Sequence, residues 1–119
     1  VTTSTLGSAA TLVFDEVDSG LGGRAAEAVA SKLQKISTVG DDRQIVCVTH
    51  LPVIAASADH HLRVVKSADS EFTHLFVGPL DEDGRELEIA RMLSGDATPD
   101  AARTHARELL QRQRARRTA

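Results

Sequence analysis

Two adjacent carboxylates, Asp15 and Glu16, come directly after an apolar-biased run from Thr11 to Phe14. A continuous apolar run of this length is typical of a β-strand that is buried in a parallel sheet. Acids at the end of such a strand are unfavourable unless each has a partner, such as a metal ion or a reacting water. The pair could therefore hold a divalent cation and deprotonate a water molecule, as metal-assisted hydrolysis requires. The alternative is a strand that ends in a solvated acidic turn.

The segments that follow are expected to form a βαβ unit that positions these acids. Apolar residues recur at helical spacing over residues 24–37, after a glycine-rich turn. A second apolar run over residues 44–49 is predicted to be a strand, parallel to the first because a helix connects them. Open α/β sheets bind ligands beyond the carboxyl ends of their strands, so Asp15, Glu16 and His50 are predicted to share one edge of the sheet.

The rest of the chain is predicted to form a hairpin and further helices. The expected order is a short helix from Pro52 to Ala58, strands over 61–66 and 72–77 joined around 68–70, an acidic turn over 79–84, a short helix that ends at Gly95, and a final helix from about Asp100. The inner face of the final helix is predicted to carry Ala102, Ala106, Leu109 and Leu110.

The composition of the 119 residues, 41% hydrophobic and 26% charged, fits one globular domain. The single cysteine, Cys47, excludes an internal disulfide and is read as a small buried hydrophobe rather than a nucleophile. No stretch approaches the roughly 18 apolar residues of a membrane span, and the start carries no basic signal-peptide region, so we infer a cytoplasmic protein. The chain begins at Val1 and has few residues before Asp15, so we expect a piece of something longer.

The formal net charge of −3 hides a basic end. Six arginines lie near the carboxyl terminus: Arg103, Arg107, Arg112, Arg114, Arg116 and Arg117. They could contact nucleic acid phosphates, or they could form a solvated helical face that complements the helix dipole.

Several motifs are absent from the printed sequence. It has no G-x-x-x-x-G-K-[ST] phosphate loop, no Leu-Ser-Gly-Gly signature and no Cys/His spacing typical of zinc sites. The chain by itself is therefore not expected to bind ATP tightly.

The first segment resembles the Walker B strand and D-loop of SMC-like ABC ATPases. It reads Thr-Leu-Val-Phe-Asp-Glu-Val-Asp over residues 11–18, followed by Ser-Gly-Leu-Gly-Gly. A second segment looks like the H-loop strand of that branch and the helix after it. It comprises Val-Cys-Val-Thr-His-Leu-Pro over residues 46–52, together with residues 55–61. The late segments 89–95 and 105–110 are similar to the RecN family of bacterial DNA repair proteins within this branch. The resemblance covers nearly the whole chain, from Thr11 to about Leu110.

The resemblance implies a role for each matching residue. Asp15 would hold Mg²⁺ through water, Glu16 would be the catalytic base, and His50 would sense the γ-phosphate of ATP. The D-loop would lie against the opposite head of a homodimer, and its residues would be Asp18, Ser19, Gly20, Leu21 and Gly22. Gly22 stands where the common ABC D-loop ends in Asp.

The implied fold is α/β: a partial P-loop NTPase lobe from an ABC ATPase head, with a parallel βαβ unit, a hairpin and C-terminal helices. Residues 1–10 would be a truncated linker, 11–111 the C-terminal lobe with the Walker B, D-loop and H-loop, and 112–119 a basic tail.

The implied function is that of the C-terminal part of a RecN-type head, which binds and hydrolyses ATP with Mg²⁺ in recombinational repair of DNA double-strand breaks at the nucleoid. The chain alone is expected to be inactive, because the N-terminal half of the head would supply the phosphate loop and a second head the signature. DNA would be bound by the full-length protein. The alternative is a stand-alone, non-catalytic interaction module derived from an ABC ATPase.

Overall fold

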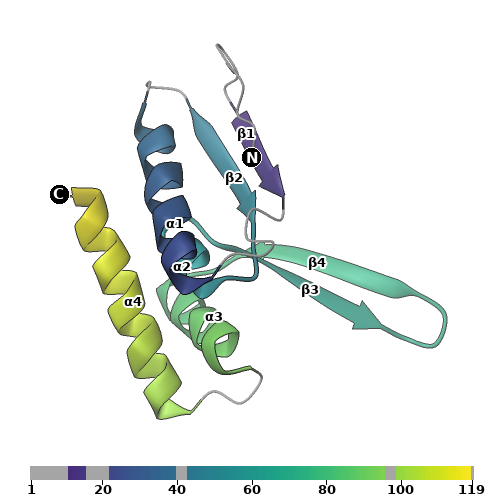
Figure 1. Cartoon of the computed structure of the whole chain (residues 1–119). Coiled ribbons are helices and arrows are strands. Elements are labelled where there is room, and N and C mark those ends of the chain that lie inside the picture. Colours follow the sequence, from purple (N-terminus) through teal and green to yellow (C-terminus); the bar gives the residue numbers. More distant parts are fainter. Residues whose placement is uncertain (1–10, 16–21, 40–42, 96–98, 119) are drawn as a thin grey trace.

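The structure, a computed structural model, describes residues 11–15, 22–39, 43–95 and 99–118. Its first part is a βαβ unit made of β1 (Thr11–Asp15), α1 (Gly23–Thr38) and β2 (Gln44–Val48) (Figure 1). The two strands pair in parallel, with Asp15 opposite Val48. The predicted crossover is therefore confirmed, and it brings the carboxyl ends of both strands to one edge of the sheet.

Among the described residues, helices cover one face of this sheet and leave the other open. On the covered face, Phe14, Ile45 and Cys47 pack against a core that includes Ala30 and Ile54. Side chains alternate along a strand, so Val13, Val46 and Val48 face the other side. There Val13 is 67% exposed, and both other valines are exposed as well. The prediction of a fully buried strand is wrong for this chain, because no described element packs on the second face.

A second core lies between α2 (Pro52–Ala56), α3 (Glu82–Ser94) and α4 (Asp100–Thr118). The predicted inner face of the last helix is confirmed, since four of its side chains are buried: Ala102, Ala106, Leu109 and Leu110. Residues 112–118, expected as a basic tail, form the last turns of α4. Gln113 in these turns is fully buried, and its amide has no hydrogen-bond partner among the described residues. None of the helices in the described ranges combines the length and apolar character needed to cross a bilayer.

The acidic segment before α3 is the start of a helix. We predicted a turn over residues 79–84, but α3 already begins at Glu82. The Asp81 carboxylate caps it by accepting a hydrogen bond from the Gly84 N–H at 2.7 Å. Glu82 and Asp83 in the first turn interact favourably with the positive end of the helix dipole. The helix ends at Gly95, as predicted, and the φ of 81° there favours glycine.

The predicted hairpin is confirmed, with longer strands than expected. β3 (Leu62–Ala68) and β4 (Thr73–Pro79) pair antiparallel. The turn follows Ala68 instead of containing it, because the Asp69 carboxylate accepts backbone hydrogen bonds from Phe72 at 2.8 Å and Glu71 at 3.1 Å. These hydrogen bonds, that of Phe72 first, lower the pKa of Asp69.

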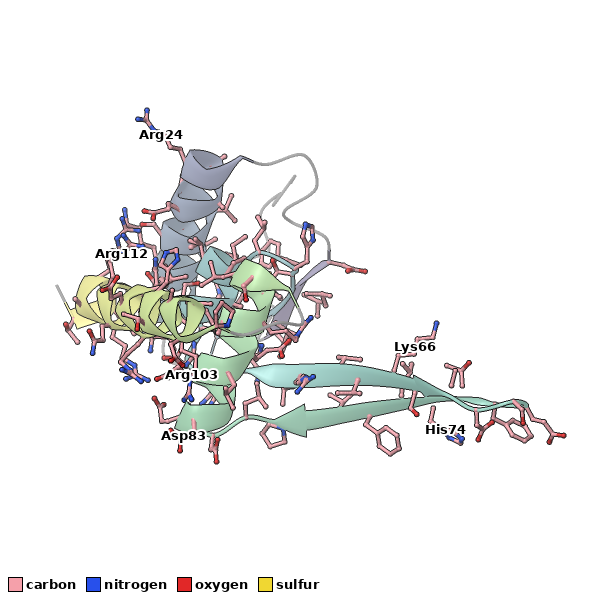
Figure 2. The ribbon with its side chains drawn as sticks, turned by 90° about the horizontal axis from the view of Figure 1, so that it is seen from below. Arg24, Lys66, His74, Asp83, Arg103 and Arg112 are labelled. Carbon is pink, nitrogen blue, oxygen red and sulfur yellow. The ribbon has the colours of Figure 1, made fainter. Side chains whose placement is uncertain are left out.

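The hairpin projects from the helices as an arm (Figures 1 and 2). The radius of gyration is 15.4 Å, whereas a compact chain of this length has about 13.5 Å. One face of the arm carries Leu62, Val64, Leu75 and Val77, each between 59% and 65% exposed. Such a contiguous apolar surface is typical of a site that another polypeptide covers.

Candidate functional site

Asp15 is the last residue of β1, and its side chain is exposed. The alternation along the strand puts it on the same open face of the sheet as Val13. Carboxylate oxygens are ligands that Mg²⁺ prefers, and Mg²⁺ often takes only one or two carboxylates and completes its shell with water and phosphate. Asp15 therefore fits a magnesium ligand. In the described ranges, no group of three or more His, Cys, Asp or Glu side chains is arranged to hold a metal ion.

His50 lies in the connection between β2 and α2. The Thr49 hydroxyl accepts a hydrogen bond from the Leu51 N–H at 3.0 Å and so closes the turn around His50. Leu51 is the N-cap residue of α2, and its carbonyl accepts from the Ala55 N–H at 3.1 Å. His50 is thus fixed on one side by a strand and on the other by a helix. The parallel register brings it to the same edge of the sheet as Asp15.

The other predicted site residues lie mainly outside the described residues. This holds for Glu16 and for residues 18–21 of the expected D-loop. Gly22 is described as the N-cap residue of α1, with a φ of −82°. A Cβ added to Gly22 would meet no atom within 4 Å, so nothing described in the chain requires glycine there.

Buried charges on α3 form a second polar centre, which the sequence analysis missed. The Glu88 carboxylate accepts hydrogen bonds from Arg91 at 3.0 and 2.7 Å and lies 3.3 Å from Arg63 at the base of the arm. The hydrogen bonds from Arg91 are the main reason that the pKa of Glu88 is lowered. Burial, followed by the charge of Arg85, lowers the pKa of His61, so its neutral form is favoured. The only signal in the sequence is the spacing of Arg85, Glu88 and Ile89, which places them on one helical face.

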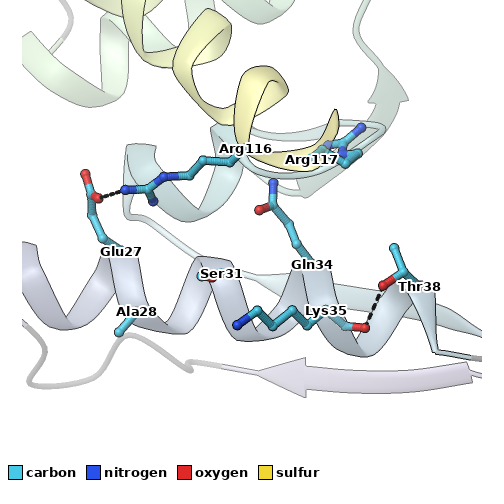
Figure 3. Close-up of a pocket in the computed structure, with 8 residues that line it drawn as sticks. All are labelled: Glu27, Ala28, Ser31, Gln34, Lys35, Thr38, Arg116 and Arg117. Atoms are coloured by element: carbon cyan, nitrogen blue, oxygen red, sulfur yellow. Dashed lines mark hydrogen bonds and ion pairs between the residues drawn. The ribbon is translucent and has the colours of Figure 1, made fainter. Parts of the chain in front are cut away.

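Five arginines of α4 contact acids elsewhere in the chain. Arg103 and Arg107 bind Glu86 on α3 at 3.2 and 2.9 Å, and Arg114 binds Glu82 on the same helix. Arg116 reaches Glu27 on α1 at 2.7 Å (Figure 3). Arg117 binds Asp59, which follows α2. Ion pairs at the protein surface each add little to stability. These five arginines together hold α4 against the rest of the chain through four acids, since Glu86 binds both Arg103 and Arg107.

A groove of about 590 Å³ lies between α1 and the end of α4. Its lining mixes both signs of charge with hydroxyl and amide groups (Figure 3): Glu27, Ala28, Ser31, Gln34, Lys35, Thr38, Arg116 and Arg117. Arg116 and Glu27 pair with each other inside it, and Lys35 and Arg117 are the other charged residues of its lining.

Comparisons with known proteins give similarity over most of the chain. No family model matches it. The chain is 52% identical over 99 residues to the DNA repair protein RecN of Deinococcus radiodurans. The aligned residues cover 83% of the chain and 17% of that protein. It is 46% identical over 110 residues to the RecN of Mycobacterium leprae, with 92% of the chain and 18% of that protein covered. It is 43% identical over 99 residues to the RecN of Bacillus subtilis, with 83% of the chain and 17% of that protein covered. The chain thus spans 17–18% of the length of these relatives.

Proposed function

Because this chain belongs to the RecN family of DNA repair proteins, as a segment that spans 17–18% of its relatives' length, we propose that it is the C-terminal part of an ATP-hydrolysing head. The observation that carries the proposal is the parallel register of β1 and β2. It puts Asp15 and the turn with His50 at one edge of the sheet, where α/β proteins bind nucleotides.

Each residue at this edge has a proposed part in hydrolysis. Asp15 orients the water shell of Mg²⁺, and Glu16, the next residue, accepts a proton from the attacking water. His50 donates a hydrogen bond to the γ-phosphate, held in place by the closed turn between Thr49 and Leu51. When bound, Mg²⁺ would neutralise the charge of the phosphates.

We propose that the missing parts of the head come from other polypeptide segments. The N-terminal half of the same head would supply the phosphate loop, and a second head in a homodimer would supply the signature motif and contact residues 18–22. The uncovered valines on the sheet and the exposed apolar face of the arm support this, since both are surfaces that favour burial. The chain alone would then be inactive.

For the full-length protein, we propose ATP-driven recombinational repair of DNA double-strand breaks, in the cytoplasm at the nucleoid. The name of the relatives, DNA repair protein RecN, supports a repair role. DNA binding is not assigned to Arg103, Arg107 or Arg114, because these side chains already pair with acids of the chain.

A non-catalytic interaction module is the second candidate. The exposed apolar face of the arm favours it, because such a face can bind a partner without any chemistry. The two functions differ in whether ATP hydrolysis depends on His50.

The test is a His50→Ala variant of the full-length protein. We expect kcat for ATP hydrolysis to fall by about 100-fold, since a donor to the reacting phosphate is lost. His105→Ala, which changes an exposed histidine on α4, is the matched control and should leave kcat unchanged. An unchanged kcat in the His50 variant would refute a part for His50 in ATP hydrolysis and favour the interaction module as the role of this chain.

A further inference from the structure

A buried arginine holds the C-terminal end of α2. The Arg85 side chain comes from α3, and its Nη2 atom donates hydrogen bonds to the carbonyl oxygens of Ala55 at 3.1 Å and Ala56 at 3.2 Å. The same atom also donates to the carbonyl oxygen of Ala58. The last carbonyls of a helix have no partner within the helix and carry its negative dipole end, so a cation is favourable there.

Two further donors reach the same helix end. Gln34 on α1 donates to the carbonyl oxygen of Ser57 at 3.0 Å, and Arg117 on α4 donates to the same oxygen at 2.8 Å. Figure 3 shows Gln34 extending from α1 toward the end of α4. Side chains from α1, α3 and α4 therefore converge on the carbonyls of residues 55–58, although α2 has only 5 residues.

The opposite end of α2 leads directly to His50. The bond between Leu51 and Thr49 fixes the turn, and the bond from Ala55 to Leu51 forms the first helical turn. Ile54 is 2% exposed and anchors the helix in the core. Residues 49–58 thus form one hydrogen-bonded piece, so a shift of its C-terminal end would also move His50.

The burial of Arg85 is unusual for an arginine. Only 6% of its surface is exposed, and burial lowers its pKa. A buried charge is unfavourable compared with an apolar side chain of similar volume unless specific partners compensate it. The three carbonyl oxygens at the end of α2 are the partners of Nη2, whereas the buried Nε has no hydrogen-bond partner among the described residues. The hydrogen bonds of this guanidinium are therefore directed at the end of α2.

We propose that Arg85 is a positioning residue for ATP hydrolysis: by holding the carbonyl end of α2, it sets the place of His50 at the edge of the sheet. The proposal rests on the proposed function of His50. Arg85 itself does not touch substrate.

The test uses Arg85→Met and Arg85→Lys in the full-length protein. In the Met variant we expect kcat to fall by about ten- to a hundredfold with an unchanged KM for ATP, because His50 is misplaced but ATP binding is not. Hydrogen exchange in residues 51–58 should accelerate at least about tenfold, because the carbonyls lose their donor. The Lys variant keeps a charged donor and should recover most of both effects. Arg112→Met, at an exposed position on α4, should change neither.

A double variant shows whether the effect passes through His50. If it does, Arg85→Met lowers kcat in the parent but adds no further loss to His50→Ala. Equal fold losses in both backgrounds, or unchanged exchange in residues 51–58, would overturn the proposal while leaving the proposed function intact. If His50→Ala itself leaves kcat unchanged, the proposed function is what fails.

A milder variant covers the case in which Arg85→Met does not fold. Gln34→Leu removes one neutral donor from the same helix end without touching a charge. It should accelerate exchange in residues 51–58 by about fivefold and lower kcat in the same direction. Unchanged exchange and kcat in this variant would count against the proposal.

Discussion

Replacing Glu16 with Gln in the full-length protein is expected to lower kcat for ATP hydrolysis by about a thousandfold, because the amide cannot accept the proton of the attacking water. ATP binding should remain nearly unchanged, since Gln has the same shape. Steady-state hydrolysis and equilibrium binding of ATP measure the two effects separately.

Glu71→Gln is the matched control for this variant. It makes the same chemical change at an exposed position in the turn of the arm, next to the bend formed by Asp69. We expect normal hydrolysis from it. If Glu16→Gln hydrolysed ATP as fast as this control, Glu16 would not be the base.

Replacing Ile89 with Ala should unfold the chain most readily among single core changes on α3. Ile89 is fully buried and belongs to the core shared with α2 and α4. Its truncation leaves a cavity and is expected to lower the free energy of unfolding by about 3 kcal/mol. Urea denaturation of the 119-residue chain measures the loss.

Leu87→Ala is the control on the same helix. Leu87 is 43% exposed, so its truncation should lower the free energy of unfolding by less than about 1 kcal/mol. Equal losses for the two variants would mean that the packing of α3 against α4 is not as the structure has it.

The βαβ unit and the inner face of α4 could be predicted from the sequence because their signals are local. Apolar runs at strand length mark β1 and β2, and the spacing of Ala102, Ala106 and Leu109 marks the buried face of α4. The start of α3 was missed because the capping acids after Pro79 have the composition of a turn. The hydrogen bonds from the Gly84 N–H to the Asp81 carboxylate and from the Arg85 N–H to the Asp81 carbonyl distinguish a helix start from a turn.

Burial could be predicted less well than the elements themselves. The apolar residues of β1 suggested a strand covered on both sides, but Val13 faces a side that no described element covers. The buried charge of Arg85 was not foreseen either, because its partners are carbonyls about 30 residues away in the sequence. Such contacts depend on how helices pack, which periodicity does not reveal.

The candidate site was predicted in part. Asp15 and His50 share one edge of the sheet because β1 and β2 are parallel. The helix that connects the two strands predicts this arrangement, and the structure confirms it. The roles of Asp15, Glu16 and His50 remain predictions.

The most direct test is ATP hydrolysis by two separately expressed pieces: this chain, and the full-length protein without it. We predict that neither piece hydrolyses ATP alone and that mixing restores hydrolysis, except when the chain carries Glu16→Gln. Full hydrolysis by the larger piece alone would contradict the central claim, because this chain would then supply no part of the ATPase site.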